Sequence, residues 1–143
     1  MGRDFLANSK IVRLSNAVAA GSSDEECTGV DMSGWTNATF IACLGTIVSG
    51  GVQSMKLQGS SDNAAADAYA DITGAVSGAV ADTDDNKIVA LEISNPSEVW
   101  VRPVVERATQ NCTIDSVIVI LTGYKGTPAE VATPTSISKA VRS

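Results

Sequence analysis

The segment ADTDDNK places oxygen-bearing side chains at a spacing that could bind a cation. Asp82, Asp84 and Asn86 alternate like the first ligands of a calcium loop, and Ca²⁺ prefers carboxylate and carbonyl oxygens. That loop needs glycine at its sixth position and glutamate at its twelfth, where this chain has Lys87 and Ile93. The spacing therefore favours a polar turn before a strand, and it leaves open whether the turn binds calcium.

Three glutamates are candidates for the paired carboxylates of a glycoside hydrolase. Such an enzyme holds one carboxyl as an acid and a second as a base or nucleophile across a cleft. Glu92, Glu98 and Glu106 lie on or beside neighbouring predicted strands. Their spacing does not direct them at one another, so we expect surface charges.

Other residue types needed for common catalytic sites are missing from the sequence. The chain has no histidine, which excludes a Ser-His-Asp triad and a Cys-His pair. It also has no G-x-S-x-G motif and no glycine-rich phosphate loop after a strand. Cys27, Cys43 and Cys112 are odd in number and far apart, unlike a disulfide framework or a zinc site. We expect a protein that is not an enzyme and uses no cofactor or metal.

The composition indicates a single β-rich domain made in a reducing cytoplasm. The chain has 143 residues, of which 44% are hydrophobic, 4% aromatic and 18% charged. Valine and isoleucine are abundant, and these β-branched residues favour strands. We find no signal peptide and no apolar run long enough to span a membrane.

The net charge of −6 is unevenly distributed. Residues 1–13 and residues 125–143 each carry a net charge of +2, so the body between them carries −10. An acidic body repels nucleic acid and anionic membranes. We therefore expect protein partners, with neither nucleic acid nor membrane, and basic ends that either aid solubility or dock on an acidic surface.

Short apolar segments separated by Gly, Asn, Asp and Ser predict an all-β protein. Strands are expected at 37–48, 51–60, 87–94, 98–107 and 115–124, with shorter ones near 69–72 and 78–80 and one or two helical turns near 62–69. The first and the last of the five long strands are apolar on both faces, which predicts central, buried strands. The pattern indicates an antiparallel β-sandwich of jelly-roll type with extended N- and C-terminal arms. The expected division is an N-terminal arm and first strand at 1–27, the sandwich at 28–124 and a C-terminal arm at 125–143.

The segment EVWVRPVVER, residues 98–107, predicts a strand with one apolar face and one mixed face. Trp100, Arg102 and Glu106 share the mixed face. Pro103 cannot donate a backbone hydrogen bond, so we expect an edge strand or a bulge. Aromatic and arginine side chains are enriched at interface centres, which predicts a contact surface at Trp100, Arg102 and Glu106. The alternative is cross-strand ion pairs of Arg102 and Glu106 within one subunit.

The final segment, KGTPAEVATPTSISKAVRS, differs in composition from the rest of the chain. Two prolines exclude a continuous strand or helix. Val131, Ile137 and Val141 are spaced through it as apolar contacts. We expect an extended arm that orders against a neighbouring subunit through these three side chains.

Four segments follow one another in a characteristic order. VDMSGWTNATFIACLG precedes a strand with MKLQGSSDN, then VADTDDNKIVALEI, then EVWVRPVVERATQNCTIDSVIVILTGYKGTP. This order resembles a group of small proteins encoded in the head modules of tailed phages and prophages. The resemblance covers residues 28–128 and is most specific at VRPVVERATQN. It implies a capsid cement, or decoration, protein that sits as a trimer on the major capsid lattice, and it carries over no catalytic residue.

We therefore expect a viral structural protein that binds the major capsid protein and itself, as a homotrimer. It would be made in the host cytoplasm and lie on the capsid exterior of the virion. A head–tail joining or tail protein is the alternative within this class. A carbohydrate-binding module is the alternative outside it, favoured by exposed aromatic residues beside a calcium site. Burial of Trp35 and Trp100 would argue against it, and we expect Trp35 to be a core residue.

Overall fold

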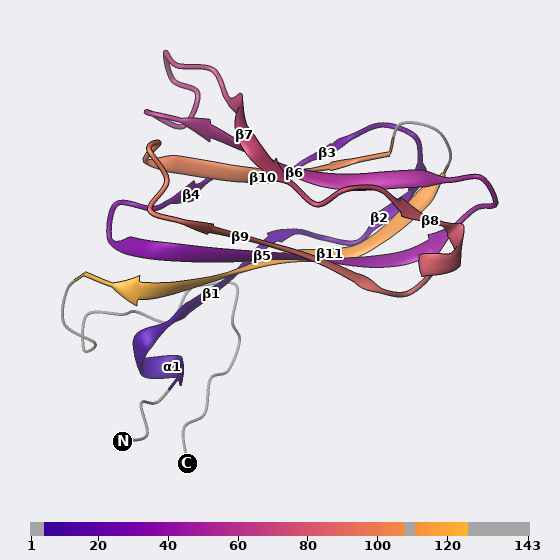
Figure 1. Ribbon diagram of the computed structural model, residues 1–143, viewed down its shortest axis with the longest axis horizontal. Coiled ribbons are helices and arrows are strands. Elements are labelled where there is room, and N and C mark those ends of the chain that lie inside the picture. Colours follow the sequence, from indigo (N-terminus) through magenta and orange to yellow (C-terminus); the bar gives the residue numbers. More distant parts are fainter. Residues whose placement is uncertain (1–4, 108–110, 126–143) are drawn as a thin grey trace.

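Two antiparallel sheets pack face to face, one above the other in Figure 1. The computed structural model describes residues 5–107 and 111–125. The upper sheet comprises β3 (Glu25–Glu26), β4 (Val30–Asp31), β6 (Val52–Ser60), β7 (Ala70–Val76), β8 (Val80–Ala81) and β10 (Trp100–Glu106). The lower sheet comprises β1 (Lys10–Ser15), β2 (Val18–Gly21), β5 (Trp35–Ile47), β9 (Ile88–Ser94) and β11 (Cys112–Tyr124).

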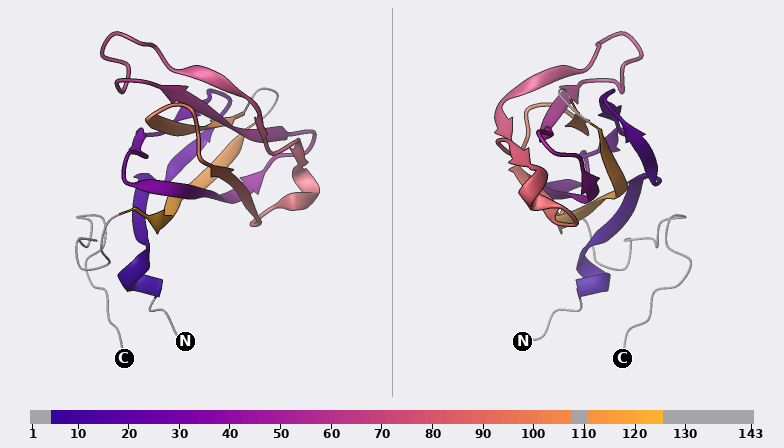
Figure 2. Two further views of the ribbon diagram at one scale, coloured as in Figure 1. Left: turned by 60° about the vertical axis from the view of Figure 1, so that its left-hand side comes forward. Right: turned by 90° about the vertical axis from the view of Figure 1, so that its right-hand side faces the viewer.

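Two short helical segments accompany the strands. The helix α1 (Phe5–Asn8) precedes β1 and stands off the sandwich in Figure 2. The 3-10 turn η1 (Asp82–Asp84) precedes β9. Residues 62–67 form turns and bends and residues 68–69 have no regular structure, so the helical turns expected there are absent. No helix in the described ranges is long and apolar enough to cross a bilayer.

Successive strands alternate between the sheets, as in a jelly roll. From β1 the chain crosses to β3 and β4, back to β5, and across to β6. It then pairs β6 with β7 inside the upper sheet, after which β9, β10 and β11 alternate again. The lower sheet has the order β1-β11-β5-β9 and the upper sheet the order β3-β10-β6-β7. The predicted all-β sandwich of jelly-roll type is therefore confirmed.

The first strands belong to this sandwich. β1 and β2 pair with β11, and β3 pairs with β10. These three strands lie within residues 1–27, where sequence analysis placed an arm and a first strand. At the other end, the backbone N–H of Lys125 donates to the carbonyl of Gly34, directly after β11.

The core lies between the sheets and consists of the inward side chains of the long strands. Phe40 and Val119 of the lower sheet and Leu57 and Val101 of the upper sheet are fully buried. Trp35 is 7% exposed and packs into the same cluster, as sequence analysis expected. The two-residue period of a strand explains why every second residue enters the core.

The prediction that Pro103 marks an edge strand was wrong. β10 lies between β6 on one side and β3 and β4 on the other. Pro103 is tolerated because its outer neighbour is interrupted, with β3 and β4 pairing on either side of it. In the gap, the backbone N–H of Cys27 donates to the carbonyl of Pro103. The segment between β3 and β4, which runs beside Pro103, therefore does not need the N–H group that proline lacks.

The buried amide of Gln53 predicts a stabilising substitution. Gln53 is 1% exposed, and neither its Nε2 nor its Oε1 has a hydrogen-bond partner in the described part of the chain. An unsatisfied buried polar group costs roughly 1–3 kcal/mol. Gln53→Met is therefore expected to raise the free energy of unfolding by about 1–2 kcal/mol in urea titrations, with an unchanged m-value.

Gln58 on the same strand provides the matched control. Its Nε2 donates to Asp71, and its Oε1 accepts from Arg102. Gln58→Met should lower the stability, because it leaves both partners unsatisfied. A loss of stability in Gln53→Met as well would mean that a buried water already satisfies its amide.

Candidate functional site

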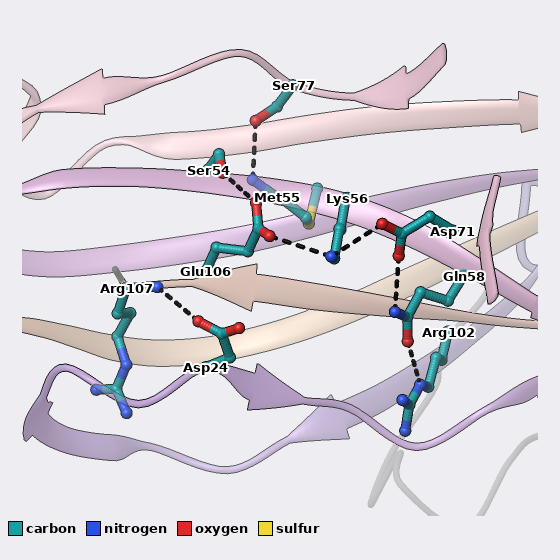
Figure 3. Close-up of polar contacts among 10 residues, drawn as sticks. All are labelled: Asp24, Ser54, Met55, Lys56, Gln58, Asp71, Ser77, Arg102, Glu106 and Arg107. Carbon is teal, nitrogen blue, oxygen red and sulfur yellow. Dashed lines mark hydrogen bonds and ion pairs between the residues drawn. The ribbon is translucent and has the colours of Figure 1, made fainter. Parts of the chain in front are cut away.

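The outer face of the upper sheet carries a network of charged and polar side chains, shown in Figure 3. Lys56 on β6 has its Nζ 3.1 Å from both Asp71 Oδ2 on β7 and Glu106 Oε1 on β10. Ser54 donates its hydroxyl to Glu106 Oε2 at 2.7 Å. Gln58 donates its amide to the second oxygen of Asp71 at 2.7 Å. One cation thus joins two carboxylates across three neighbouring strands.

Arg102 continues this network toward the other edge of the sheet. Its Nε donates to Gln58 Oε1 at 2.9 Å, and its guanidinium lies 3.1 Å from Glu26 Oε2 on β3. The guanidinium also lies 4.4 Å from the ring centre of Tyr69, a cation–π geometry. Tyr69 in turn packs against Gly29, where an added Cβ would collide with its hydroxyl. The Nε and one terminal nitrogen of Arg102 are therefore bound to partners inside the subunit.

The sequence-predicted contact residues on β10 take part in this intrasubunit network. Arg102 pairs with Glu26 and Glu106 with Lys56, which is the cross-strand alternative that sequence analysis left open. Trp100 begins the strand and is half-buried. The other three predicted contact residues, Val131, Ile137 and Val141, lie outside the described residues.

The network lowers the pKa of its carboxyl groups. The hydroxyl of Ser54 and the ammonium of Lys56 lower the pKa of Glu106, and Gln58 and Lys56 lower that of Asp71. A depressed folded-state pKa stabilises the protein above the unfolded-state value, about 4.3 for Glu and 3.9 for Asp. That stabilisation is lost as the pH falls through the folded-state pKa values.

This electrostatic effect is testable by NMR titration of the side-chain carboxyls. In the unmodified chain, Glu106 should titrate below ~4.3. Lys56→Met should raise the pKa of Glu106, because it removes a hydrogen bond and a positive charge. Lys87→Met is the matched control, since Lys87 pairs with Asp84 at a distant turn. The same Glu106 pKa in all three chains would contradict the network.

Arg107 forms a second polar cluster, buried at the end of β10. Its side chain is 4% exposed. The guanidinium donates to three backbone carbonyls, those of Ala19 at 2.9 Å, Ser23 at 2.7 Å and Cys112 at 2.7 Å. Its backbone N–H donates to Asp24 Oδ1 at 3.2 Å (Figure 3). Arg107 thus ties the β2–β3 segment to the start of β11.

The carboxylates of the acidic turn at residues 82–86 accept hydrogen bonds from backbone N–H groups. Asp85 accepts from the N–H of Ile47, Asp82 from Gly50 and Asp84 from Ala81. Within residues 5–107 and 111–125, no group of three or more His, Cys, Asp or Glu side chains could hold a metal ion. The polar turn before the strand at 88–94, favoured by sequence analysis, is confirmed.

The three glutamates considered for glycoside hydrolysis do not converge. Glu106 lies on the outer face of the upper sheet, in the Lys56 network. Glu92 lies opposite Thr39 on the lower sheet and is exposed. Glu98 lies in the loop between β9 and β10, against Gly59. The sandwich separates the first two, so they cannot flank one sugar.

Two hollows of about 420 and 430 Å³ flank the β9–β10 loop. Ser97 and Glu98 contribute to both. The first is otherwise lined by the start of β7, and the second by Trp35, Asn95 and Lys125 among others. Because Trp35 is a core side chain, it presents no open platform on which a sugar could stack.

The lower sheet has a different outer face, made of aliphatic side chains. Phe40 and Val119 point inward and are fully buried. Because successive strand residues point to opposite faces, Ile41, Ile118 and Ile120 point outward. These three are only half-buried. The two central strands of this sheet are thus apolar on both sides.

Cross-strand register joins the outward side chains into one patch. Ile11 of β1 lies opposite Ile120 of β11, and Ile118 lies opposite Ile41 of β5. On the edge strand β9, Ala90 lies opposite Ile41 and Ile88 lies opposite Cys43. Opposite residues of antiparallel strands point to the same side, with Cβ atoms ~5 Å apart. The patch, here called the isoleucine face, consists of Ile11, Ile41, Cys43, Ile88, Ala90, Ile118 and Ile120, and the same side of these strands carries the polar side chains of Arg13, Thr39 and Ser116 beside it.

The isoleucine face has no covering layer in the part of the chain that the structure describes. No strand or helix packs across it, and α1 contacts β11 only at the end of the sheet. Ile88 is 62% exposed. The prediction that 37–48 is buried on both faces is wrong for its outer face, whereas the central position predicted for 115–124 is confirmed, since β11 lies between β1 and β5. The described residues form two layers, so among them the outer side of each sheet is a surface.

A signal for this surface was present in the sequence. Strands that are apolar on both faces need a covering element on each side. The chain contains no long helix with an apolar stripe that could supply the second cover. Both observations together indicate an uncovered apolar face, a conclusion that sequence analysis did not draw.

The chain has limited similarity to known proteins. No protein-family model matches it, and no curated protein sequence matches it. Among solved structures, it is similar to the SPBc2 prophage-derived protein YomS, with 13% sequence identity and a TM-score of 0.48. The similarity covers 81% of this chain and 94% of that one. At this identity the similarity is one of fold alone.

Proposed function

We propose that this chain is a structural protein of a tailed-phage head, which binds the major capsid lattice and itself and thereby stabilises the head. It acts as a homotrimer on the outside of the capsid, by binding and without catalysis. The observation that carries the proposal is the isoleucine face, an apolar sheet surface with no cover from the described residues. The phage-head resemblance of VRPVVERATQN gives the class of partner.

An uncovered aliphatic surface supports a binding function because its exposure to water is unfavourable. Four strands about 4.8 Å apart, with one outward apolar residue on β1 and two on each of β5, β9 and β11, give a patch on the order of 300 Å². Contiguous apolar patches of this size on a soluble domain commonly mark an interaction site. The polar network of the upper sheet is in contrast satisfied within the subunit, so it offers a partner few free donors or acceptors.

Symmetry makes a modest contact sufficient. A trimer on a capsid repeats each contact three times, and the repeated sites add their areas in one rigid assembly. The uneven charge fits the same use, because basic ends of +2 can approach the acidic body of a neighbour. A cement protein needs no more than this, since its work is to hold neighbouring capsid subunits together.

Cosedimentation with phage heads assembled without this chain tests the proposal. The purified chain should bind these heads saturably, in multiples of three copies, and raise the temperature at which they release DNA. Binding to isolated tails or to the head–tail connector, and not to the head shell, would instead assign the chain to head–tail joining or to the tail. No binding to any virion part would refute the proposal.

A further inference from the structure

We propose that the isoleucine face receives residues 126–143 from a neighbouring copy of this chain. This inference rests on the proposed function, because it identifies the contact that holds the homotrimer together. Its occupant is an extended segment, in which Val131 and Ile137 would lie on the isoleucine face and Val141 would contact the neighbouring copy beyond its end.

The dimensions of the isoleucine face suit an extended segment. A stable contact between two folded domains buries about 800 Å² on each partner. A patch on the order of 300 Å² is much smaller, although it is about as long as six extended residues at ~3.3 Å each. It is therefore large enough for one segment of chain and too small for a second sandwich docked by itself.

The sequence of residues 126–143 has the matching pattern. Val131, Ile137 and Val141 are separated by six and four residues. Even separations place all three side chains on one side of an extended chain. Val131 and Ile137 would lie ~20 Å apart, close to the length of the isoleucine face. The opposite side carries mostly alanine, serine and proline, which can face water.

The position of Lys125 allows residues 126–143 to extend to a neighbouring subunit. Lys125 lies directly after β11, and its N–H is bound to the carbonyl of Gly34 at the end of the lower sheet. Eighteen further residues can extend to about 59 Å. That is about three times the length of the isoleucine face, so the segment is long enough to leave its own subunit and cross the next one.

The acidic body of the neighbouring copy also favours this occupant. Glu92 on β9 is exposed and lies opposite Thr39, next to the row that holds Ile41 and Ala90. The segment carries Lys139 and Arg142 against a single acidic side chain. Arg13 on β1 is exposed, lies opposite Ile118 and carries a charge opposite to that of Glu92, so the attraction comes from the net charge of −10 on residues 14–124 as a whole.

Cys43 provides a built-in probe, because it belongs to the isoleucine face. Burial raises the pKa of the Cys27 thiol to about 12 and raises that of Cys112. Both are buried, whereas Cys43 is half-buried. Alkylation by iodoacetamide, located by mass spectrometry, therefore reports whether the face is covered.

The test uses the full chain, with alkylation of Cys43 followed at concentrations above and below trimer dissociation. The variant V131S/I137S/V141S should be alkylated about tenfold faster than the unmodified chain and should elute as a monomer. The variant A132S/A140S changes the opposite side of the segment, so it should match the unmodified chain in both measurements. Dilution of the unmodified chain should expose Cys43.

Two outcomes would overturn the inference. Equal alkylation rates in the unmodified chain and V131S/I137S/V141S would show that the segment does not cover the face. A monomeric chain whose Cys43 stays protected at every dilution would place the segment on its own sheet. If either occurs while the chain still binds heads, the inference fails and the proposed function stands; loss of head binding by the unmodified chain refutes the proposed function itself.

Discussion

Arg107→Met is expected to lower the free energy of unfolding by about 3–5 kcal/mol. The substitution keeps most of the aliphatic stem but removes the guanidinium that donates to the carbonyls of Ala19, Ser23 and Cys112. These carbonyls come from two separate segments, the β2–β3 segment and the start of β11, and would lose charged donors in a site where Arg107 is 4% exposed. Urea unfolding followed by tryptophan fluorescence measures the loss.

Arg107→Lys is the control that separates charge from geometry. Lysine keeps the positive charge, but its compact ammonium cannot reproduce the planar fork of arginine. An intermediate loss of stability is therefore expected. If the free energy of unfolding of Arg107→Met lies within about 1 kcal/mol of that of the unmodified chain, the three hydrogen bonds contribute little. The structural role of Arg107 is then refuted.

Ile118→Glu is expected to weaken self-association and head binding at least 100-fold, or about 2.7 kcal/mol. Ile118 lies between β1 and β5, opposite Ile41 on one side and the exposed Arg13 on the other. A carboxylate there would have to be desolvated in any complex that covers the face. The fold should change little, by less than about 1 kcal/mol, because the side chain is already half-exposed.

Ser94→Glu is the matched control for this substitution. Ser94 lies opposite Asn37 on the same side of the lower sheet, beyond the isoleucine face. It adds the same charge to the same sheet without entering the apolar patch. Head binding and solution mass should therefore stay as in the unmodified chain. Ile118→Glu with an unchanged mass and unchanged head binding would contradict the role of the face.

The fold class could be predicted because strand periodicity and turn residues are local signals. The alternation in KIVALEIS and the both-sided apolar pattern of DSVIVILTGY identify β9 and β11 directly. Trp35 could also be placed in the core, since a large side chain in a β-rich chain with few aromatic residues is needed there. These inferences require only neighbouring residues.

The partners of individual charges could not be predicted, because they depend on strand order. Pro103 indicated an edge strand, yet the strand beside it is interrupted, a detail set by the pairing of β3 and β4 around it. Arg107 ends the strand predicted at 98–107, but its carbonyl partners include that of Ala19, 88 residues away. Only the assembled sandwich brings these groups together.

The solution mass of the full chain, measured by light scattering after size exclusion over a range of concentrations, tests the central claim most directly. The claim is that this jelly roll functions by assembly through the isoleucine face. It predicts a mass of three times the 14.7 kDa chain for the unmodified protein and Ser94→Glu, and a single-chain mass for Ile118→Glu. A single-chain mass for the unmodified protein at every concentration would contradict it.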